Sequence, residues 1–196
     1  MSKLSDLAKG LTPKSSLRNN ENSIMFSQKY PVIVKTFDDA PLSDLRDDIL
    51  KCGDVQKQKT NVQADMTNWF MHHTHSSFQW VCDRAIEIAS ENNPHKINMF
   101  VYDCWGAVYK QGDFTKEHDH WPALWSFVFY VDCCEDCAPL VFPTTLNNDD
   151  PLRHSKVFYP KNGKMIVFPA WIIHNVLKQT CNHDRIMVAG NIRLSK

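Results

Sequence analysis

The chain has 196 residues, of which 43% are hydrophobic and 11% aromatic, a length and composition that suit one folded domain. Its 22 Lys and Arg residues balance 22 Asp and Glu residues, so no overall positive field exists to attract nucleic acid. No run approaches the ~20 apolar residues that span a bilayer. Seven cysteines without an export signal predict reduced thiols. We therefore expect a soluble, cytoplasmic protein that binds neither nucleic acid nor a membrane.

The two ends of the chain differ in composition. Residues 1–26 are polar and show no sustained apolar period, which predicts a mobile N-terminal arm. Residues 27–196 are expected to form a single domain. Within it, residues 27–96 supply a strand and supporting helices, and residues 97–196 supply a β-rich core.

Two helices are expected before the β-rich half. The first is predicted to start with Ser43 as its N-cap and to stop at Cys52-Gly53. The second is predicted to begin near Ser76, because apolar residues then fall three and four positions apart on one face, and to end before Pro94. A short β-rich run at residues 30–34 precedes both helices.

From Ile97 onward, short runs of Val, Ile, Phe, Tyr and Trp alternate with turn residues, the pattern of an all-β sandwich or barrel. The polar segment 146–153 is expected to be a loop between the two halves of this region. The pattern predicts a mainly β jelly-roll fold with flanking helices. The expected strands lie near residues 97–110, 113–119, 124–132, 138–143, 156–159, 164–168, 172–178 and 185–194.

Three histidines form a candidate metal site. His118 and His120 are two apart, and on an extended chain this spacing turns both imidazoles to the same side. His174 lies in a strand expected to run antiparallel beside theirs, whereas alternation turns Asp119 away from a shared metal. Three ligands on one face of an octahedral metal leave the other positions free for co-substrate and dioxygen, as in non-haem iron oxygenases.

The segments around these histidines come in a recognisable order. Gly112-Asp113-Phe114 precedes the histidine pair, a strand over 126–130 follows it, and a turn over 163–169 ending in Phe-Pro leads to His174. This order resembles the prolyl-4-hydroxylase-like Fe(II)/2-oxoglutarate oxygenases, and more closely the small oxygenases of bacteria and bacteriophages, over residues 97–194. The resemblance implies a cupin-like double-stranded β-helix in which residues 27–196 are catalytic. It also implies a protein that a phage can encode to act in a bacterial host.

The resemblance also implies a co-substrate pocket. Arg185 matches the basic residue that holds the remote carboxylate of 2-oxoglutarate, and a guanidinium fork suits a carboxylate. Tyr109 and Tyr130 match tyrosines near 2-oxoglutarate, and Asn191 shares the face of Arg185 by even spacing. The chain departs from most of the superfamily at His120, where an Asp or Glu ligand is usual. Three neutral imidazoles leave Fe(II) its full double charge, which a dianionic co-substrate can compensate.

By the resemblance, the enzyme uses Fe(II), dioxygen and 2-oxoglutarate to hydroxylate a peptidyl or small-molecule substrate, with a peptidyl or free amino acid such as proline as the first candidate. Two alternatives stay open. The same three histidines occur in cupin-like thiol dioxygenases that use no 2-oxoglutarate, and a jelly roll can bind metal without catalysis. The substrate mouth is expected to be lined by aromatic residues: Trp69, Phe70, Trp121, Trp125 and Trp171.

Two further motifs are interpreted as having no function. The second histidine group, over residues 71–75, precedes a helix without a matching third ligand, so we interpret it as a solvated linker. The Cys-x-x-Cys between Cys134 and Cys137 lacks a second cysteine pair with ligand spacing. It is interpreted as a hairpin loop with incidental thiols.

Overall fold

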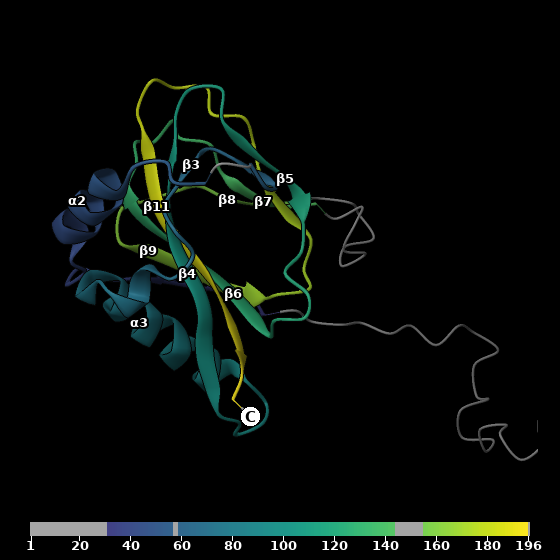
Figure 1. Cartoon of the computed structure of the whole chain (residues 1–196). Coiled ribbons are helices and arrows are strands. Elements are labelled where there is room, and N and C mark those ends of the chain that lie inside the picture. The colour runs from purple at the N-terminus through teal and green to yellow at the C-terminus, as the bar shows by residue number, and fades with distance from the viewer. Residues whose placement is uncertain (1–30, 57–58, 144–154, 196) are drawn as a thin grey trace, which may run out of the picture.

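Two antiparallel β-sheets face each other in the computed structural model, which describes residues 31–56, 59–143 and 155–195 (Figure 1). The larger sheet contains, in spatial order, β1 (Ile33–Thr36), β9 (Lys164–Pro169), β6 (Trp125–Asp132), β11 (Arg185–Leu194), β4 (Met99–Tyr109) and β3 (Asp65–Met66). The smaller sheet contains β2 (Val62–Gln63), β5 (Phe114–His118), β10 (His174–Val176), β7 (Leu140–Phe142) and β8 (Lys156–Phe158).

This arrangement confirms the predicted mainly β jelly roll. Each strand expected after residue 97 is present, with bounds that differ from the expected ones by a few residues. The first strand begins at Ile33, within the β-rich run expected at residues 30–34. The expected arm over 1–26 and the expected loop over 146–153 lie outside the described residues.

Two helices cover the outer face of the larger sheet (Figure 1). Helix α3 (Ser76–Asn92) has the predicted bounds, and Phe78, Val81 and Ala85 are fully buried on its sheet-facing side. Helix α2 (Leu42–Cys52) begins before Ser43, so the predicted N-cap is wrong: Pro41 is the N-cap, and its carbonyl accepts the hydrogen bond from the backbone N–H of Leu45.

A second apolar cluster fills the space between the two sheets. It joins Met187 and Ile166 of the larger sheet to Leu140 and Val176 of the smaller one. Because strand β6 is covered by helices on one side and by the smaller sheet on the other, its first seven residues are buried. The larger sheet is therefore the rigid layer against which the strands of the smaller sheet are placed.

Strand register positions the histidine-bearing elements. Strands β5 and β10 are antiparallel neighbours in the smaller sheet, with His118 opposite His174. Strand β11 lies at the centre of the larger sheet between β4 and β6, and Arg185 at its start pairs with Tyr109 at the end of β4.

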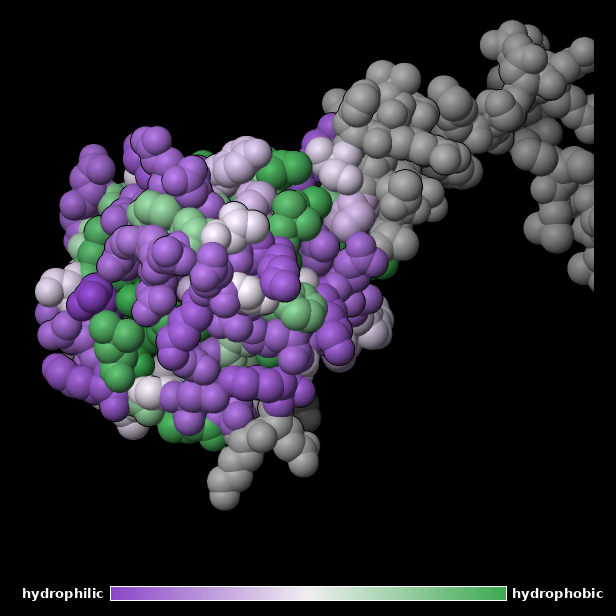
Figure 2. Space-filling model, turned by 90° about the horizontal axis from the view of Figure 1, so that it is seen from above, coloured by the Kyte–Doolittle hydropathy of each residue, from purple (hydrophilic) through white to green (hydrophobic). Residues whose placement is uncertain are grey.

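The surface is mostly polar on the side seen from above, where hydrophobic residues form only small patches (Figure 2). Within the described part of the chain, no helix has both the length and the apolar character needed to cross a membrane.

Candidate metal and co-substrate site

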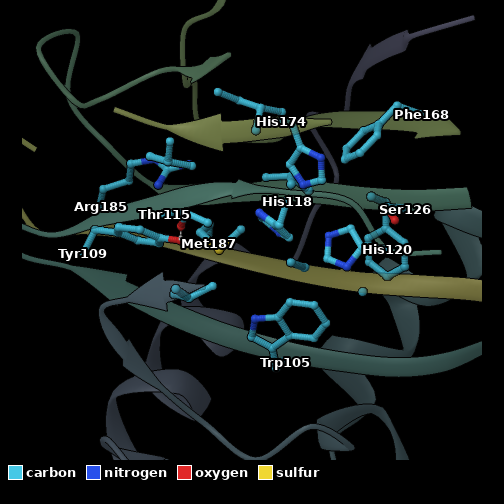
Figure 3. A pocket seen from close by; sticks show the side chains of 17 residues that line it. Trp105, Tyr109, Thr115, His118, His120, Ser126, Phe168, His174, Arg185 and Met187 are labelled. Carbon is cyan, nitrogen blue, oxygen red and sulfur yellow. Dashed lines mark hydrogen bonds between the residues drawn. The ribbon is translucent and has the colours of Figure 1, made fainter. Parts of the chain in front are cut away.

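Three imidazoles converge at one end of the space between the sheets (Figure 3). The ring centroids of His118 and His174 are 4.4 Å apart, and His120 lies 4.7 Å from His118 and 5.0 Å from His174. One nitrogen of each ring lies within 4.8 Å of one nitrogen of each of the others. These three residues are thus close enough for a single ion to bind all of them.

Backbone carbonyls orient two of the rings. Nδ1 of His118 lies 2.7 Å from the carbonyl oxygen of Lys116, and Nδ1 of His174 lies 2.9 Å from that of Ile172. With Nδ1–H donating to these carbonyls, Nε2 of each ring keeps its lone pair for a metal, which is the usual arrangement for ligating histidines.

The third ring lies just beyond the end of β5 and is positioned by its own backbone. The backbone N–H of His120 donates to the carbonyl oxygen of Ala170 at 2.7 Å, which joins the segment after β5 to the turn before β10. Asp119, between His118 and His120, is exposed, and its Oδ1 accepts a hydrogen bond from the backbone N–H of Trp121. Side chains therefore alternate as expected from His118 to Asp119, and Asp119 is turned away from a metal shared by the histidines.

Burial keeps the three imidazoles neutral. It lowers the pKa of His120 to about 3 and the pKa of His174 well below its ordinary value. The pKa of His118 is also lowered by burial, partly offset by its hydrogen bond to Lys116. At neutral pH, a metal ion therefore meets unprotonated ligands and does not have to displace a proton.

Arg185 lies at the far end of the same cavity (Figure 3). Its side chain is 0% exposed, and none of its three guanidinium nitrogens has a hydrogen-bond partner among the described residues. A fully buried cation with neither a hydrogen-bonded nor an anionic partner costs several kcal/mol. An anionic ligand that enters the cavity would remove this cost, and a carboxylate fits the guanidinium fork in two parallel hydrogen bonds.

The cavity between the histidines and Arg185 is narrow and largely apolar. Its volume is about 40 Å³. Its lining combines the three imidazoles and Arg185 with hydrocarbon from Leu140, Val176, Met187 and Ala189. Such a cavity suits a short, linear molecule that is charged at both ends and carries methylene groups between them.

Two tyrosines surround the guanidinium. Its Cζ lies 4.6 Å from the ring centroid of Tyr109 and 5.2 Å from that of Tyr130. The hydroxyl of Tyr109 is hydrogen-bonded to Oγ1 of Thr115 at 2.6 Å, and the buried hydroxyl of Tyr130 has no partner among the described residues. Burial raises the pKa of both phenols, although the charge of Arg185 offsets part of the rise, so both stay protonated donors.

Asn191 lies apart from Arg185, at the histidine end of β11. Its Oδ1 accepts a hydrogen bond from the Ser126 hydroxyl, and its Nδ2 donates to Oδ1 of Asp103. Ser126 lines the cavity, but Asn191 does not. The structure therefore does not bring Asn191 to the pocket, and it places a hydroxyl held by Asn191 there instead.

The expected substrate mouth is only partly formed by the predicted aromatic residues. Trp121 is 73% exposed on the segment after His120, and Trp171 and Phe70 are each 45% exposed. Trp69 packs edge-on against Trp105, with ring centroids 4.7 Å apart. The assignment of Trp125 to the mouth is wrong, because Trp125 is buried in the helix-facing cluster.

Sequence reasoning missed three residues that line the cavity. Trp105 lies beneath the histidines, with its ring centroid 6.5 Å from that of His120 (Figure 3). Thr115 and Ser126 supply hydroxyl groups. Thr115 lies three residues before His118 on the same short strand, and Ser126 was recognised only as part of a motif. Neither carries a sequence signal that distinguishes it from an ordinary strand residue.

The interpretation of the other two motifs needs correction. His72 is buried in the 3-10 turn Met71–His73, so this part of the expected solvated linker is wrong. The cysteines after β6 do not form a hairpin, because β6 and the following strand β7 belong to different sheets. Cys134 and Cys137 instead lie beside Cys181, with the three sulfur atoms within 4.8 Å of one another.

The residues present fit a divalent metal and a dicarboxylate. Three neutral imidazole nitrogens suit a borderline metal such as Fe(II) and leave its double charge uncompensated. The buried guanidinium of Arg185 is a second uncompensated charge at the opposite end of the cavity. A ligand with a negative charge at each end would therefore compensate both the metal at the three imidazoles and the guanidinium of Arg185.

Comparisons with known proteins agree with this geometry. The protein family described as "Putative 2OG-Fe(II) oxygenase" matches residues 103–191, the segment that holds all three histidines and Arg185. A comparison with curated proteins gives no match.

Several solved structures share the fold. The viral collagen prolyl hydroxylase of Paramecium Bursaria Chlorella virus-1, solved as a 2OG complex, has a TM-score of 0.63 at 19% identity, over 86% of this chain and 97% of that one. A prolyl-4-hydroxylase of Pseudomonas putida has a TM-score of 0.61 at 14% identity, over 85% and 94%. HygX of Streptomyces hygroscopicus, solved with nickel, 2-oxoglutarate and hygromycin B, has a TM-score of 0.62 at 8% identity, over 86% and 84%. At these identities the likeness establishes a shared double-stranded β-helix.

Proposed function

We propose that this chain is an Fe(II)- and 2-oxoglutarate-dependent oxygenase of the prolyl-4-hydroxylase-like kind, and that it hydroxylates a peptidyl or free amino acid, with proline as the first candidate. In this proposal His118, His120 and His174 bind the iron. Arg185 binds the remote carboxylate of 2-oxoglutarate, and Tyr109 and Tyr130 complete that end of the pocket.

One observation carries the assignment of the pocket. The guanidinium of Arg185 is fully buried and unpaired, and it faces the three imidazoles across an apolar cavity. Burying such a charge costs free energy that an anionic ligand would recover. 2-Oxoglutarate has a carboxylate for Arg185, two methylene groups for the apolar middle, and a 2-oxo acid group for the metal.

Fe(II) and 2-oxoglutarate, when bound, would supply the oxidising chemistry: 2-oxoglutarate would lose CO2 and take one oxygen atom of dioxygen to give succinate, and the other oxygen atom would enter a substrate C–H bond. The protein contributes binding, orientation and exclusion of water. The apolar walls formed by Leu140, Val176 and Met187 keep bulk water from the co-substrate. The Thr115 hydroxyl fixes the phenol of Tyr109, whose ring faces Arg185.

The surface beside the histidines supports a substrate with an apolar ring. Trp121 follows His120 directly and is 73% exposed, and Trp171 lies three residues before His174 and is 45% exposed. The hydrogen bond between His120 and Ala170 holds the two segments together. A proline ring presented by an extended peptide can pack on these indoles through its C–H groups, without needing a charged partner.

The first experiment separates this proposal from a thiol dioxygenase. Adding 2-oxoglutarate without oxygen to the Fe(II) protein should produce a weak visible charge-transfer band. Oxygen and a proline-rich peptide should then give succinate and a peptide heavier by one oxygen atom. If cysteine is oxidised without 2-oxoglutarate and no succinate forms, the thiol dioxygenase is the correct assignment.

Substrate choice is tested in the same assay. A proline-rich peptide, a matched peptide with alanine in place of proline, and free proline should be compared by coupled succinate formation and mass. Product from the proline peptide alone supports a peptidyl-proline hydroxylase. Product from free proline alone supports a small-molecule enzyme, and succinate without product from any of them would contradict the proposed substrate class.

We also propose that residues 27–196 form one catalytic domain, since both sheets, both helices and the whole cavity lie within the described part of that range. A cytoplasmic site of action, in a bacterial host if a phage encodes the protein, agrees with seven free cysteines and a ferrous cofactor.

A further inference from the structure

Three cysteines from two separate loops lie close together in the fold. Cys134 and Cys137 lie in the connection from β6 to β7, and Cys181 lies in the connection from β10 to β11. The sulfur atoms are 3.5 Å apart for Cys134 and Cys137, 3.6 Å for Cys134 and Cys181, and 3.8 Å for Cys137 and Cys181. They form a nearly equilateral triangle.

The size of this triangle matches a tetrahedral metal site. With Zn–S bonds of about 2.3 Å, two thiolates on a tetrahedral zinc lie about 3.8 Å apart. Sulfur atoms in a disulfide lie about 2.05 Å apart, and three thiols cannot all pair with one another. The Cys-x-x-Cys spacing of the first two residues is also the spacing found in zinc-binding loops.

A buried amide points at the sulfur atoms. Gln179 is 1% exposed, and its Nε2 lies 3.1 Å from Sγ of Cys181 and 3.4 Å from Sγ of Cys137. Its Oε1 accepts a hydrogen bond from the backbone N–H of Ala138, and its Nε2 also donates to the carbonyl oxygen of His183 at 2.9 Å, so the direction of the amide is fixed. Neutral thiols are weak acceptors, whereas metal-bound thiolates are good ones. The position of Gln179 therefore favours sulfur atoms that carry negative charge.

We propose that Cys134, Cys137 and Cys181 bind a Zn²⁺ ion as thiolates, at a site separate from the three histidines. Binding displaces the three thiol protons and changes no oxidation state. We assign the fourth ligand to His183, which lies two residues after Cys181 in the same loop and whose side chain is 40% exposed. Its Nε2 contacts Oδ1 of Asp132 at 3.1 Å, so Nδ1 is the nitrogen available for a metal.

This ion would tie together two loops that are already joined by hydrogen bonds, such as the one from the backbone N–H of Ala138 to Gln179. The loop that carries Cys181 ends at Arg185, and the loop that carries Cys134 and Cys137 begins at the end of β6 beside β11. Zinc would therefore hold the start of β11 against its neighbour. Its loss should loosen this corner of the fold, while the histidine site at the other end of the cavity keeps its ligands.

The main experiment measures metal content. Full-length protein made in medium with zinc and iron should contain about one zinc per chain, and His174→Ala should keep it. Cys137→Ser and Cys181→Ser should lose it. Cys133→Ala is the matched control, because Cys133 lies in the same loop but its thiol contacts Asn162 and lies outside the triangle. It should keep its zinc. His183→Ala should bind zinc at least 10-fold more weakly.

A second measurement needs no variant and so does not depend on whether a variant folds. Wild-type protein titrated with Co²⁺ should show thiolate-to-cobalt charge-transfer absorption and the intense visible bands of tetrahedral cobalt. A mercurial that modifies thiols should release the zinc of the wild-type protein.

Three results would overturn the proposal. One is wild-type protein that contains no zinc and gives no thiolate-to-cobalt bands. Another is zinc that is lost in His174→Ala and kept in Cys137→Ser, which would place it in the histidine site. The third is a Cys134–Cys137 disulfide in protein purified without oxidant, which would indicate a redox pair. Unchanged zinc affinity in His183→Ala would overturn the assignment of the fourth ligand.

Discussion

His118 and His174 occupy opposite positions in the antiparallel pair of β5 and β10, and their ring centroids are 4.4 Å apart. Each ring is oriented by a carbonyl oxygen two residues earlier in its own chain segment. The distance between the two rings is thus set by strand register, and their orientation by local backbone. The site is therefore formed before a metal binds, which reduces the ordering that binding requires.

Removal of one of the proposed histidine ligands should strongly weaken iron binding. We expect His174→Ala to bind Fe(II) on the order of 100-fold more weakly or worse, because even residues that merely orient ligands change metal affinity by 10- to 100-fold. Iron per chain after desalting and succinate formation are the measurements. His73→Ala, at an exposed histidine outside the site, is the control. Equal iron content in both variants would rule out His174 as a ligand.

Arg185→Met should separate stability from co-substrate binding. Without 2-oxoglutarate, the variant should be at least as stable as the wild type, since an unpaired buried charge is replaced by hydrocarbon. Its affinity for 2-oxoglutarate should fall about 30-fold or more, because truncating one partner of a buried charge pair costs about 2–5 kcal/mol.

Thermal unfolding with and without 2-oxoglutarate measures both effects in the Fe(II) protein. Arg84→Met, which removes a surface arginine of helix α3, is the control and should keep the ligand-induced stabilisation. A large loss of stability in ligand-free Arg185→Met would show that the arginine has a structural partner and is not reserved for a ligand.

Much of the fold could be predicted because its signals are local. The strands after residue 97 are runs of β-branched and aromatic residues bounded by turn residues, and the face of helix α3 shows the 3.6-residue period. Strands β2 and β3 were not predicted, because two residues are too few to show a period. They form through pairing with β5 and β4, which is long-range information.

The same distinction between local and long-range information explains which parts of the site could be predicted. His118 and His120 were predicted from their spacing, and the jelly-roll order brought His174 beside them. The place of Trp125 was missed because β6 is covered on both faces, so its residue pattern does not show which side chains reach the surface. Cys181 was not linked to Cys137, because only the packing of two distant loops brings them together.

Gly190 should tolerate no side chain. It lies in the middle of β11 and lines the cavity, and a Cβ there would lie 2.5 Å from the carbonyl oxygen of Asp103 and 2.5 Å from Cζ of Phe127. We expect Gly190→Ala to destabilise the protein by about 1–3 kcal/mol, or about 2–10 °C in Tm. Thermal unfolding of the metal-free protein is the measurement. An unchanged Tm would mean that β11 can shift away from β4.

His72 should make the fold sensitive to acid. Burial lowers the pKa of His72 below its ordinary value of 6.5, with a smaller contribution from His73. The unfolded chain therefore binds more protons at this position than the folded chain does as the pH falls below 6.5. The free energy of unfolding should accordingly be highest above pH 6.5 and should decrease as the pH falls through the interval between the unfolded and folded pKa values.

His72→Gln removes this titration, so the decrease in unfolding free energy between pH 7.5 and pH 5.5 should be smaller in the variant than in the wild type. Urea unfolding at the two pH values measures the difference. The other titrating groups are the same in both proteins, so their contributions cancel in the comparison. His95→Gln, at an exposed histidine, should behave as the wild type does. If His72→Gln and the wild type lose the same stability over this interval, the buried imidazole is not the acid-sensitive group. The folded protein would then contain a partner that stabilises the protonated form of His72.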